Sequence, residues 1–167
     1  LQLTKQDEIE ICTSVGADVL FNYYNKPAIV SGIGDCVEPF VMKKEYYVLL
    51  VKPRTGISTK DAYDNLDMNI CDHPDIDVLN KALIVGDGIE GLLGNSLEQP
   101  SLLLNDEINT VKSELIKAGA KNVLMSGSGS TVFAISENND EIDTLSNLVK
   151  GKGFDNLSGP IGIYSVT

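Results

Sequence analysis

In the first 41 residues, one stretch carries apolar residues at helical spacing, and the apolar residues after it form short runs separated by turn residues. Thr4 and Asp7 resemble a capping box, and the apolar residues after them predict a helix over residues 5–14. A strand-like run is expected to continue through Tyr24, with further antiparallel strands at 28–31 and 37–40. Together these elements hold too little apolar surface for an independent fold.

From residue 45 onward the apolar pattern alternates between the strand period and the helix period. Residues 45–52 form a nearly continuous apolar run, which is typical of a central strand. Caps and amphipathic spacing predict helices that start at Ser58 or Thr59 and at Pro74, and a longer one over residues 100–118. The other expected elements are a short helical piece at 88–93, strands at 122–126, 131–136 and 159–167, and a helix at 141–150. This order predicts an α+β fold of the ferredoxin-like, split βαβ type with extra helices after its first strand.

Composition restricts the partners and the location of the chain. A formal charge of −11 and a pI near 4.4 argue against nucleic acid or an anionic membrane as the main partner. The longest apolar runs are too short to span a bilayer. Cys12, Cys36 and Cys71 are widely spaced with only His73 nearby, which favours reduced thiols in a cytoplasmic protein over a disulfide framework. For the same reason we expect no metal site built from protein ligands.

A serine–glycine turn between two apolar runs is the first candidate for chemistry. Its residues, in order, are Ser126, Gly127, Ser128, Gly129, Ser130 and Thr131. Alternating glycines allow positive φ, and successive N–H groups in such a turn can form a concave nest that attracts phosphate. The spacing matches neither the P-loop nor the dinucleotide fingerprint. A plain hairpin turn remains the alternative interpretation.

Asp18 is the second candidate, because it follows Gly16-Ala17 at an expected junction between a helix and a strand. A carboxylate that projects into a cleft there could accept the proton of a substrate hydroxyl during phosphoryl transfer. The alternative is an aspartate that only caps a strand or a turn. The other acidic residues are expected on solvated faces, and no Ser-His-Asp or Cys-His arrangement can be assembled.

Several segments in this order resemble the 4-diphosphocytidyl-2-C-methyl-D-erythritol kinases of the GHMP kinase superfamily. They are GADVLF (16–21), AIVSGIGD (28–35), VKPRTGIST (51–59), NSLEQP (95–100), GAKNVLMSGSGSTVFA (119–134) and the run at 159–167. The combination points to these enzymes more than to mevalonate or homoserine kinases, although neither glycine motif alone would do so.

This resemblance implies an ATP-dependent transferase that phosphorylates the 2-hydroxyl of a cytidine diphosphate-linked methylerythritol in the non-mevalonate isoprenoid pathway. By the same likeness Asp18 is the catalytic base, and residues 126–131 are the signature loop beside the phosphates. Thr59 and Tyr63 fall where the family places residues against the cytosine, with the aromatic ring stacked on the base. Mg²⁺ is expected to arrive with ATP rather than in a protein cage.

The departures from the family pattern concern both single residues and whole elements. Leu20 stands where the family usually has Pro, Asn25-Lys26 replaces Gly-Gly, and NSLE replaces Asn-Asp-Leu-Glu. The family's phosphate loop, its catalytic Lys and part of its cytosine site are not among these residues. We therefore expect a C-terminal portion, with residues 1–41 as the tail of the ATP-binding domain and 42–167 as the GHMP kinase C-terminal domain.

Such a portion is expected to lack kinase activity by itself and to expose strand edges near residues 21–30, which favours a homodimer. Three other functions stay open: a GHMP kinase for another small alcohol, of the mevalonate or homoserine type; a non-catalytic ferredoxin-like domain for ligand binding or regulation; and an inactive homologue retained for protein contacts.

Overall fold

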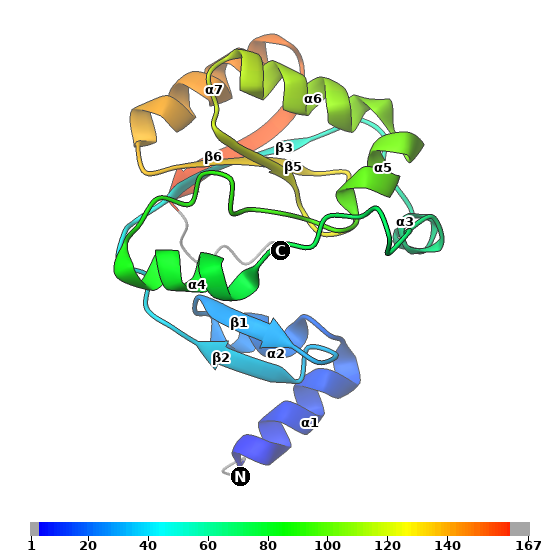
Figure 1. The fold of residues 1–167 in the computed structure, drawn as a ribbon, viewed down its shortest axis with the longest axis vertical. Helices are drawn as coiled ribbons and strands as arrows, with labels where there is room; N and C mark the ends of the chain where they lie inside the picture. The colour runs from blue at the N-terminus through cyan, green and yellow to red at the C-terminus, as the bar shows by residue number, and fades with distance from the viewer. Residues whose placement is uncertain (1–3, 161–167) are drawn as a thin grey trace.

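The computed structural model describes residues 4–160 and contains two sheets (Figure 1). The larger one has four antiparallel strands: β3 (Tyr47–Lys52), β4 (Asn122–Met125), β5 (Val132–Ser136) and β6 (Asp155–Pro160). Their order in the sheet is β4-β5-β3-β6, so the first strand of the set lies between its third and fourth. This is the ferredoxin-like arrangement, and both the predicted α+β class and the central position of β3 are confirmed.

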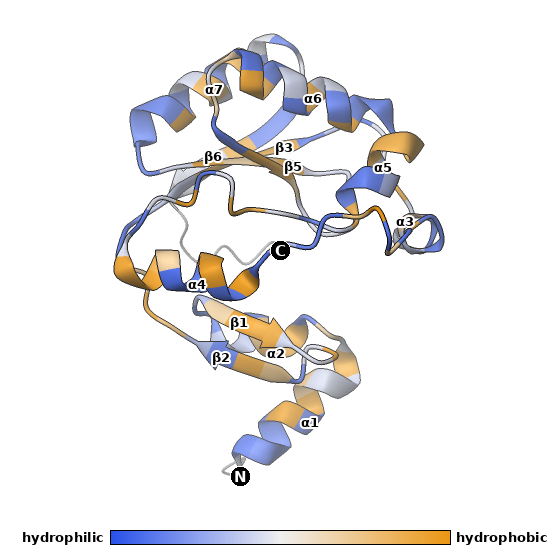
Figure 2. Cartoon of the chain, viewed as in Figure 1, coloured by the Kyte–Doolittle hydropathy of each residue, from blue (hydrophilic) through white to orange (hydrophobic). Residues whose placement is uncertain are grey.

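One face of the four-stranded sheet is covered by α6 (Asp106–Lys117) and α7 (Asn139–Gly151), which carry hydrophobic and hydrophilic residues side by side (Figure 2). Val132 and Ala134 of β5 point to this face, where they join a fully buried cluster with Leu49 and Val51. The intervening residues of β5 point to the opposite face, as the period of a strand requires. There α4 (Ile76–Val85) packs with Tyr46 and Ile135 in a second cluster.

The smaller sheet joins β1 (Ala28–Ser31) to β2 (Cys36–Pro39), and α1 (Lys5–Val15) and α2 (Val19–Tyr24) lie beside it (Figure 1). The predicted capping box is confirmed, since the Thr4 hydroxyl accepts from the Asp7 N–H and the Asp7 carboxylate accepts from the Thr4 N–H. The strand expected through Tyr24 is wrong, because this run forms the short helix α2. Its first turn closes through two bonds from Asn22 to the Asp18 carbonyl, one from the main chain and one from the side chain.

Three other expectations need correction. The helix predicted over 100–118 is two helices, α5 (Glu98–Leu104) and α6, because Asn105 takes an extended conformation between them. Residues 88–93 form turns rather than a helical piece. The closing strand β6 begins at Asp155, before the predicted start, and the rest of the predicted 159–167 strand lies outside the described residues. The helices predicted from Ser58 and Pro74 and over 141–150 are confirmed as α3 (Thr59–Asp64), α4 and α7.

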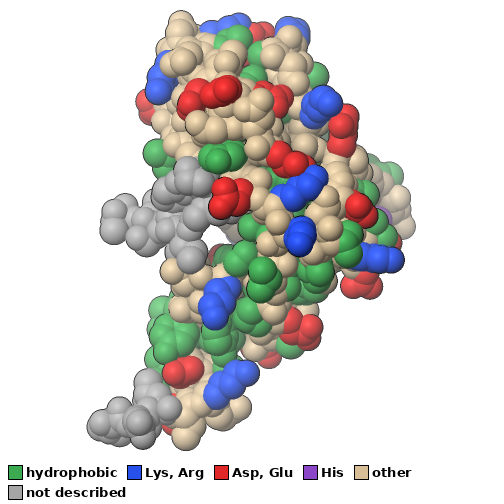
Figure 3. Space-filling view, turned by 90° about the vertical axis from the view of Figure 1, so that its left-hand side faces the viewer, with side chains coloured by type: hydrophobic (Ala, Val, Ile, Leu, Met, Phe, Trp, Pro, Cys, Tyr) green, Lys and Arg blue, Asp and Glu red, His purple; other side chains and the backbone are tan. Residues whose placement is uncertain are grey.

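Hydrophobic side chains gather on the face shown in Figure 3, below the four-stranded sheet. Among residues 4–41, the exposed large hydrophobic residues are Ile11, Val15, Phe21, Tyr23, Val30, Ile33 and Val41. Within residues 4–160, no helix combines the length and the hydropathy that crossing a membrane requires.

Candidate functional site

The serine–glycine loop, residues 126–131, joins β4 to β5 and is closed at its base by a hydrogen bond of 2.8 Å from the Ser126 N–H to the Thr131 carbonyl. Within it, the Gly129 N–H donates to the Ser126 carbonyl at 3.0 Å. Gly127 and Gly129 have positive φ values of 56° and 91°. A Cβ at Gly129 would also lie 2.7 Å from the Met125 sulfur, so another residue there would need a strained φ and a shift of that side chain.

The segment at residues 55–59 holds this loop in place through one side chain and one main-chain carbonyl. The Thr59 and Ser128 hydroxyls are hydrogen-bonded at 2.9 Å, although 69 positions separate them in the sequence. The buried Ser130 hydroxyl donates to the Thr55 carbonyl at 2.8 Å. The loop is therefore attached to the segment that leads into α3. Thr59 and the loop at 126–131, which the sequence predicts as two parts of one site, thus lie together.

Asn95 and Glu98 also fix the loop, and neither was predicted from the sequence to have a role. The Asn95 amide donates to the carbonyls of Met125 and Gly127, both at 2.8 Å. The Glu98 carboxylate accepts from the Met125 N–H at 2.8 Å and pairs with Lys112 at 2.5 Å. Both residues belong to the NSLEQP segment, and the polar residues of this segment are the sequence feature that could have predicted their roles.

The Thr55 carbonyl is a second point of attachment. It accepts from the Ser130 hydroxyl and, at 3.0 Å, from the amide of Asn105 in the break between α5 and α6. The Thr55 N–H and hydroxyl donate in turn to the Glu107 carboxylate at 3.0 and 2.8 Å. These hydrogen bonds hold the pKa of the Glu107 carboxyl below its usual value of 4.5.

Asp18 is exposed at the N-cap position of α2, but its side chain makes no capping hydrogen bond. The turn between β1 and β2 packs against the segment that carries Asp18, because Gly34 of this turn is buried against the Ala17 backbone. A Cβ at Gly34 would lie only 2.0 Å from the Ala17 carbonyl oxygen. The Asp18 carboxylate is thus positioned by the backbone and left available, rather than used as a cap.

Thr59 and Tyr63 lie one turn apart in α3, whose N-cap Ser58 accepts from the Asp61 N–H. The Tyr63 ring is 59% exposed, so a planar ligand could stack on it. Within residues 4–160, no hydrogen bond joins the Asp18 side chain to the loop at 126–131. The structure thus brings Thr59 to the loop, whereas the Asp18 side chain has no hydrogen bond to it among the described residues.

An apolar hollow of about 270 Å³ lies beside the loop and does not include Asp18. Its lining residues are Pro74, Ile76, Leu79, Leu93, Gly94, Asn95, Leu124, Met125, Ser126, Gly127 and Phe133. A Cβ at Gly127 would meet nothing within 4 Å, so the backbone there is open to a ligand such as a phosphate group. In the described part of the chain, no three carboxylate, thiol or imidazole side chains are grouped to hold a metal ion.

Comparison with known proteins agrees with this fold. Residues 79–153 match the family described as GHMP kinases C terminal. A 4-diphosphocytidyl-2-C-methyl-D-erythritol kinase from Bacillus cytotoxicus is 37% identical over 153 residues, and one from Bacillus cereus is 36% identical over 153. Each alignment covers 90% of this chain, which spans about half, 53%, of each relative's length.

Solved structures show the same fold. A 4-(cytidine 5'-diphospho)-2C-methyl-D-erythritol kinase superimposes with a TM-score of 0.78 at 24% identity, covering 92% of this chain and 56% of that one. A homoserine kinase from Cytophaga hutchinsonii superimposes with a TM-score of 0.61 at 18% identity, covering 93% and 54%. The chain therefore carries a GHMP kinase C-terminal domain, and over 90% of its length it is similar to 4-diphosphocytidyl-2-C-methyl-D-erythritol kinases.

Proposed function

We propose that this chain supplies part of an ATP-dependent kinase that phosphorylates the 2-hydroxyl of 4-diphosphocytidyl-2-C-methyl-D-erythritol in the non-mevalonate isoprenoid pathway. The observation that carries the proposal is the Thr59–Ser128 hydrogen bond of 2.9 Å. It joins the segment proposed to contact the cytosine to the loop proposed to lie beside the phosphates. The names of the relatives at 36–37% identity support the same substrate.

In this proposal the Asp18 carboxylate accepts the proton of the 2-hydroxyl while that oxygen bonds to the γ-phosphorus and the bond from this phosphorus to ADP breaks. The open backbone at Gly127 contacts a phosphate oxygen, and the Tyr63 ring stacks on the cytosine while Thr59 lies beside it. Mg²⁺ bound to ATP would supply neutralisation of the phosphate charge.

We also propose that residues 1–41 and 42–167 belong to different domains of the kinase, and that the enzyme acts in the cytoplasm. The free thiols Cys12, Cys36 and Cys71 support the second point. Positioning and electrostatic stabilisation supply most of the catalysis in phosphoryl transfer. We therefore expect this chain alone to show no turnover of ATP. Turnover by the purified chain that disappears in Asp18→Asn would contradict this expectation.

A chimera tests the function itself. The 153 aligned residues of the Bacillus cytotoxicus relative are replaced by those of this chain, and ADP release is measured with the diphosphocytidyl substrate, mevalonate and homoserine. We expect turnover of the first substrate only, with kcat lowered about 100-fold or more by Asp18→Asn. Asp143→Asn, on α7, is the matched control and should leave kcat unchanged. A preference for either other alcohol, or full activity of Asp18→Asn, would refute the proposal.

A further inference from the structure

The apolar hollow beside the serine–glycine loop takes its lining from one face of the four-stranded sheet. Its floor is the pair Leu124 and Phe133, which lie directly opposite each other on β4 and β5. Phe133 lies between two residues of β5 that point to α6 and α7, so this pair points to the other face, on which α4 packs. Ile76 and Leu79, about one turn apart on α4, form a wall of the hollow.

This floor is incompletely covered by the rest of the chain. Leu124 and Phe133 stay partly exposed, whereas Val132 and Ala134, on either side of Phe133, are at most 1% exposed. The volume of the hollow, about 270 Å³, is slightly below the roughly 300–1,000 Å³ of sites for drug-sized ligands. Because covering exposed apolar surface is favourable, the hollow suits an apolar chain of a few carbons.

The loop next to the hollow has main-chain donors to spare. Ser126 and Gly127 of this loop line the hollow. Within residues 4–160, the N–H groups of Ser126 and Gly129 donate to carbonyls of the loop, whereas those of Gly127 and Ser128 have no acceptor. Successive free N–H groups in a turn with a positive φ bind anions. The loop end of the hollow therefore favours an anionic group such as a phosphate.

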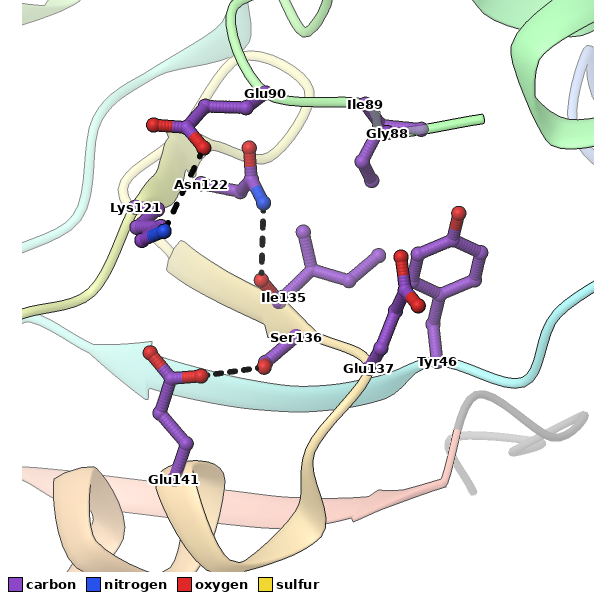
Figure 4. A pocket seen from close by; sticks show the side chains of 10 residues that line it. All are labelled: Tyr46, Gly88, Ile89, Glu90, Lys121, Asn122, Ile135, Ser136, Glu137 and Glu141. Carbon is purple, nitrogen blue, oxygen red and sulfur yellow. Dashed lines mark hydrogen bonds and ion pairs between the residues drawn. The ribbon is translucent and has the colours of Figure 1, made fainter. Parts of the chain in front are cut away.

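The charge of the lining is compatible with an anion. Among the described residues that line the hollow, none is charged. A pocket of about 230 Å³ at the other end of the β4–β5 hairpin differs, because the carboxylates of Glu90, Glu137 and Glu141 line it, against one ammonium group from Lys121 (Figure 4). These carboxylates would repel an anion. Of these two pockets, the hollow beside the loop is therefore the one that suits an anionic ligand.

We propose that the hollow and the loop together bind a short alkyl phosphate. Its chain lies against Leu124 and Phe133, and its phosphate accepts from the N–H groups of Gly127 and Ser128. The inference rests on the phosphate contact proposed above for Gly127, and it adds an apolar subsite next to that contact. The chain covers the exposed floor of the hollow, and the phosphate supplies the charged acceptor that both N–H groups lack.

NMR titration of the full chain tests the site with three probes. Methyl phosphate has the phosphate and almost no chain, butyl phosphate has both parts, and 1-butanol has only the chain. Each buried methylene should raise the affinity about fourfold, so butyl phosphate should bind roughly 60-fold more tightly than methyl phosphate. Butyl phosphate should shift the backbone signals of Leu124 and Gly127 but not that of Ser136, which lines the pocket in Figure 4. 1-Butanol should leave the Gly127 signal unshifted.

The formal charge of −11 makes this titration a stringent one, because it opposes the binding of any anion. General attraction to the chain therefore cannot produce the expected shifts. Work at about 0.15 M salt screens the repulsion from carboxylates more than about 8 Å away, so that the local groups decide the affinity.

Two matched variants on α4 test the apolar subsite. Ile76 and Val78 are both β-branched and similarly exposed, at 49% and 46%, but of the two only Ile76 lines the hollow. Ile76→Thr should weaken butyl phosphate about two- to fourfold and leave methyl phosphate unaffected, whereas Val78→Thr should change neither.

The inference is overturned if butyl phosphate binds no more tightly than methyl phosphate, or if the two variants weaken it equally. In that case methyl phosphate should still shift the Gly127 signal, and the phosphate contact of the proposed function stands without the apolar subsite. A Gly127 signal that neither phosphate shifts would refute both the subsite and that contact. Turnover by the chimera tests the kinase reaction independently of these titrations.

Discussion

Asn95→Ala should loosen the serine–glycine loop, because a single amide group holds it at two points. The side chain donates to the carbonyls of Met125 and Gly127, and its oxygen accepts from the Leu97 N–H at 3.0 Å, next to the start of α5. Alanine removes all three hydrogen bonds and adds no new contact. The substitution therefore measures what the amide contributes to the free energy of unfolding.

The three bonds differ in value because their partners differ in exposure. Met125 is 1% exposed, so water cannot reach its carbonyl easily, and that bond should be worth about 1.5 kcal/mol. Gly127 is exposed, so water replaces its bond at a loss of about 0.5 kcal/mol. Losing the bond to Leu97 at the helix start should cost about 0.5–1 kcal/mol. We expect Asn95→Ala to lower the unfolding free energy by about 2.5–3 kcal/mol.

Urea unfolding followed by circular dichroism measures this loss, with the slope of the transition expected to stay unchanged. Asn95→Asp is the informative second variant, because it keeps the acceptor for Leu97 but points a carboxylate at two carbonyls. We expect it to destabilise at least as much as alanine. Asn139→Ala, which removes an exposed amide contact to Asp143, is the control and should change stability by less than about 0.5 kcal/mol. A loss below 1 kcal/mol for Asn95→Ala, or a near wild-type Asn95→Asp, would refute this account of the loop.

Three further changes test other contacts. Gly34→Ala should destabilise by about 2–4 kcal/mol in urea unfolding, because its φ is +91° and its Cβ would overlap the Ala17 carbonyl, whereas Gly56→Ala, which meets nothing within 4 Å, should have little effect; similar losses would contradict the close approach. Lys112→Met should cost about 1–3 kcal/mol by the same measurement, because it leaves the Glu98 carboxylate, 16% exposed, without its cation; an unchanged midpoint would show that the pair contributes nothing. Glu107→Gln should lower the melting temperature at neutral pH, and the gap should close in acid: the hydrogen bonds from Thr55 depress the folded pKa, so their stabilisation is present above the usual value of 4.5 and is lost as pH falls through the folded pKa. A gap that is constant with pH would contradict this linkage.

Local signals in the sequence were sufficient for most elements of the fold. The capping box at Thr4 involves residues three apart, and the apolar run of β3 is visible without its neighbours. The failures occurred where a run was too short to show its period or where distant contacts decide. The run that forms α2 is only six residues long, too short to show a helical period, and its apolar and aromatic residues also suit a strand. Asn105 interrupts an otherwise helical pattern, and its amide bonds to Thr55, 50 positions away.

The candidate site shows the same division. The glycine spacing alone was sufficient to predict the loop at 126–131 as a candidate site, because the ability to adopt positive φ belongs to glycine itself. The roles of Asn95 and Glu98 could not be derived in this way, since their partners lie 27 to 32 positions further along the chain. Hydrogen bonds of this kind leave no periodic pattern in the sequence.

The central position of β3 also has a consequence for the growing polypeptide on the ribosome. Both of its neighbours, β5 and β6, are encoded late, and about 80 residues separate Lys52 from Val132. At roughly 5–20 residues per second, translation takes roughly 4–16 s to deliver the first of them. The strand that the finished protein shields best is thus the one that a nascent chain leaves uncovered longest, and it is the stretch that a chaperone would need to guard.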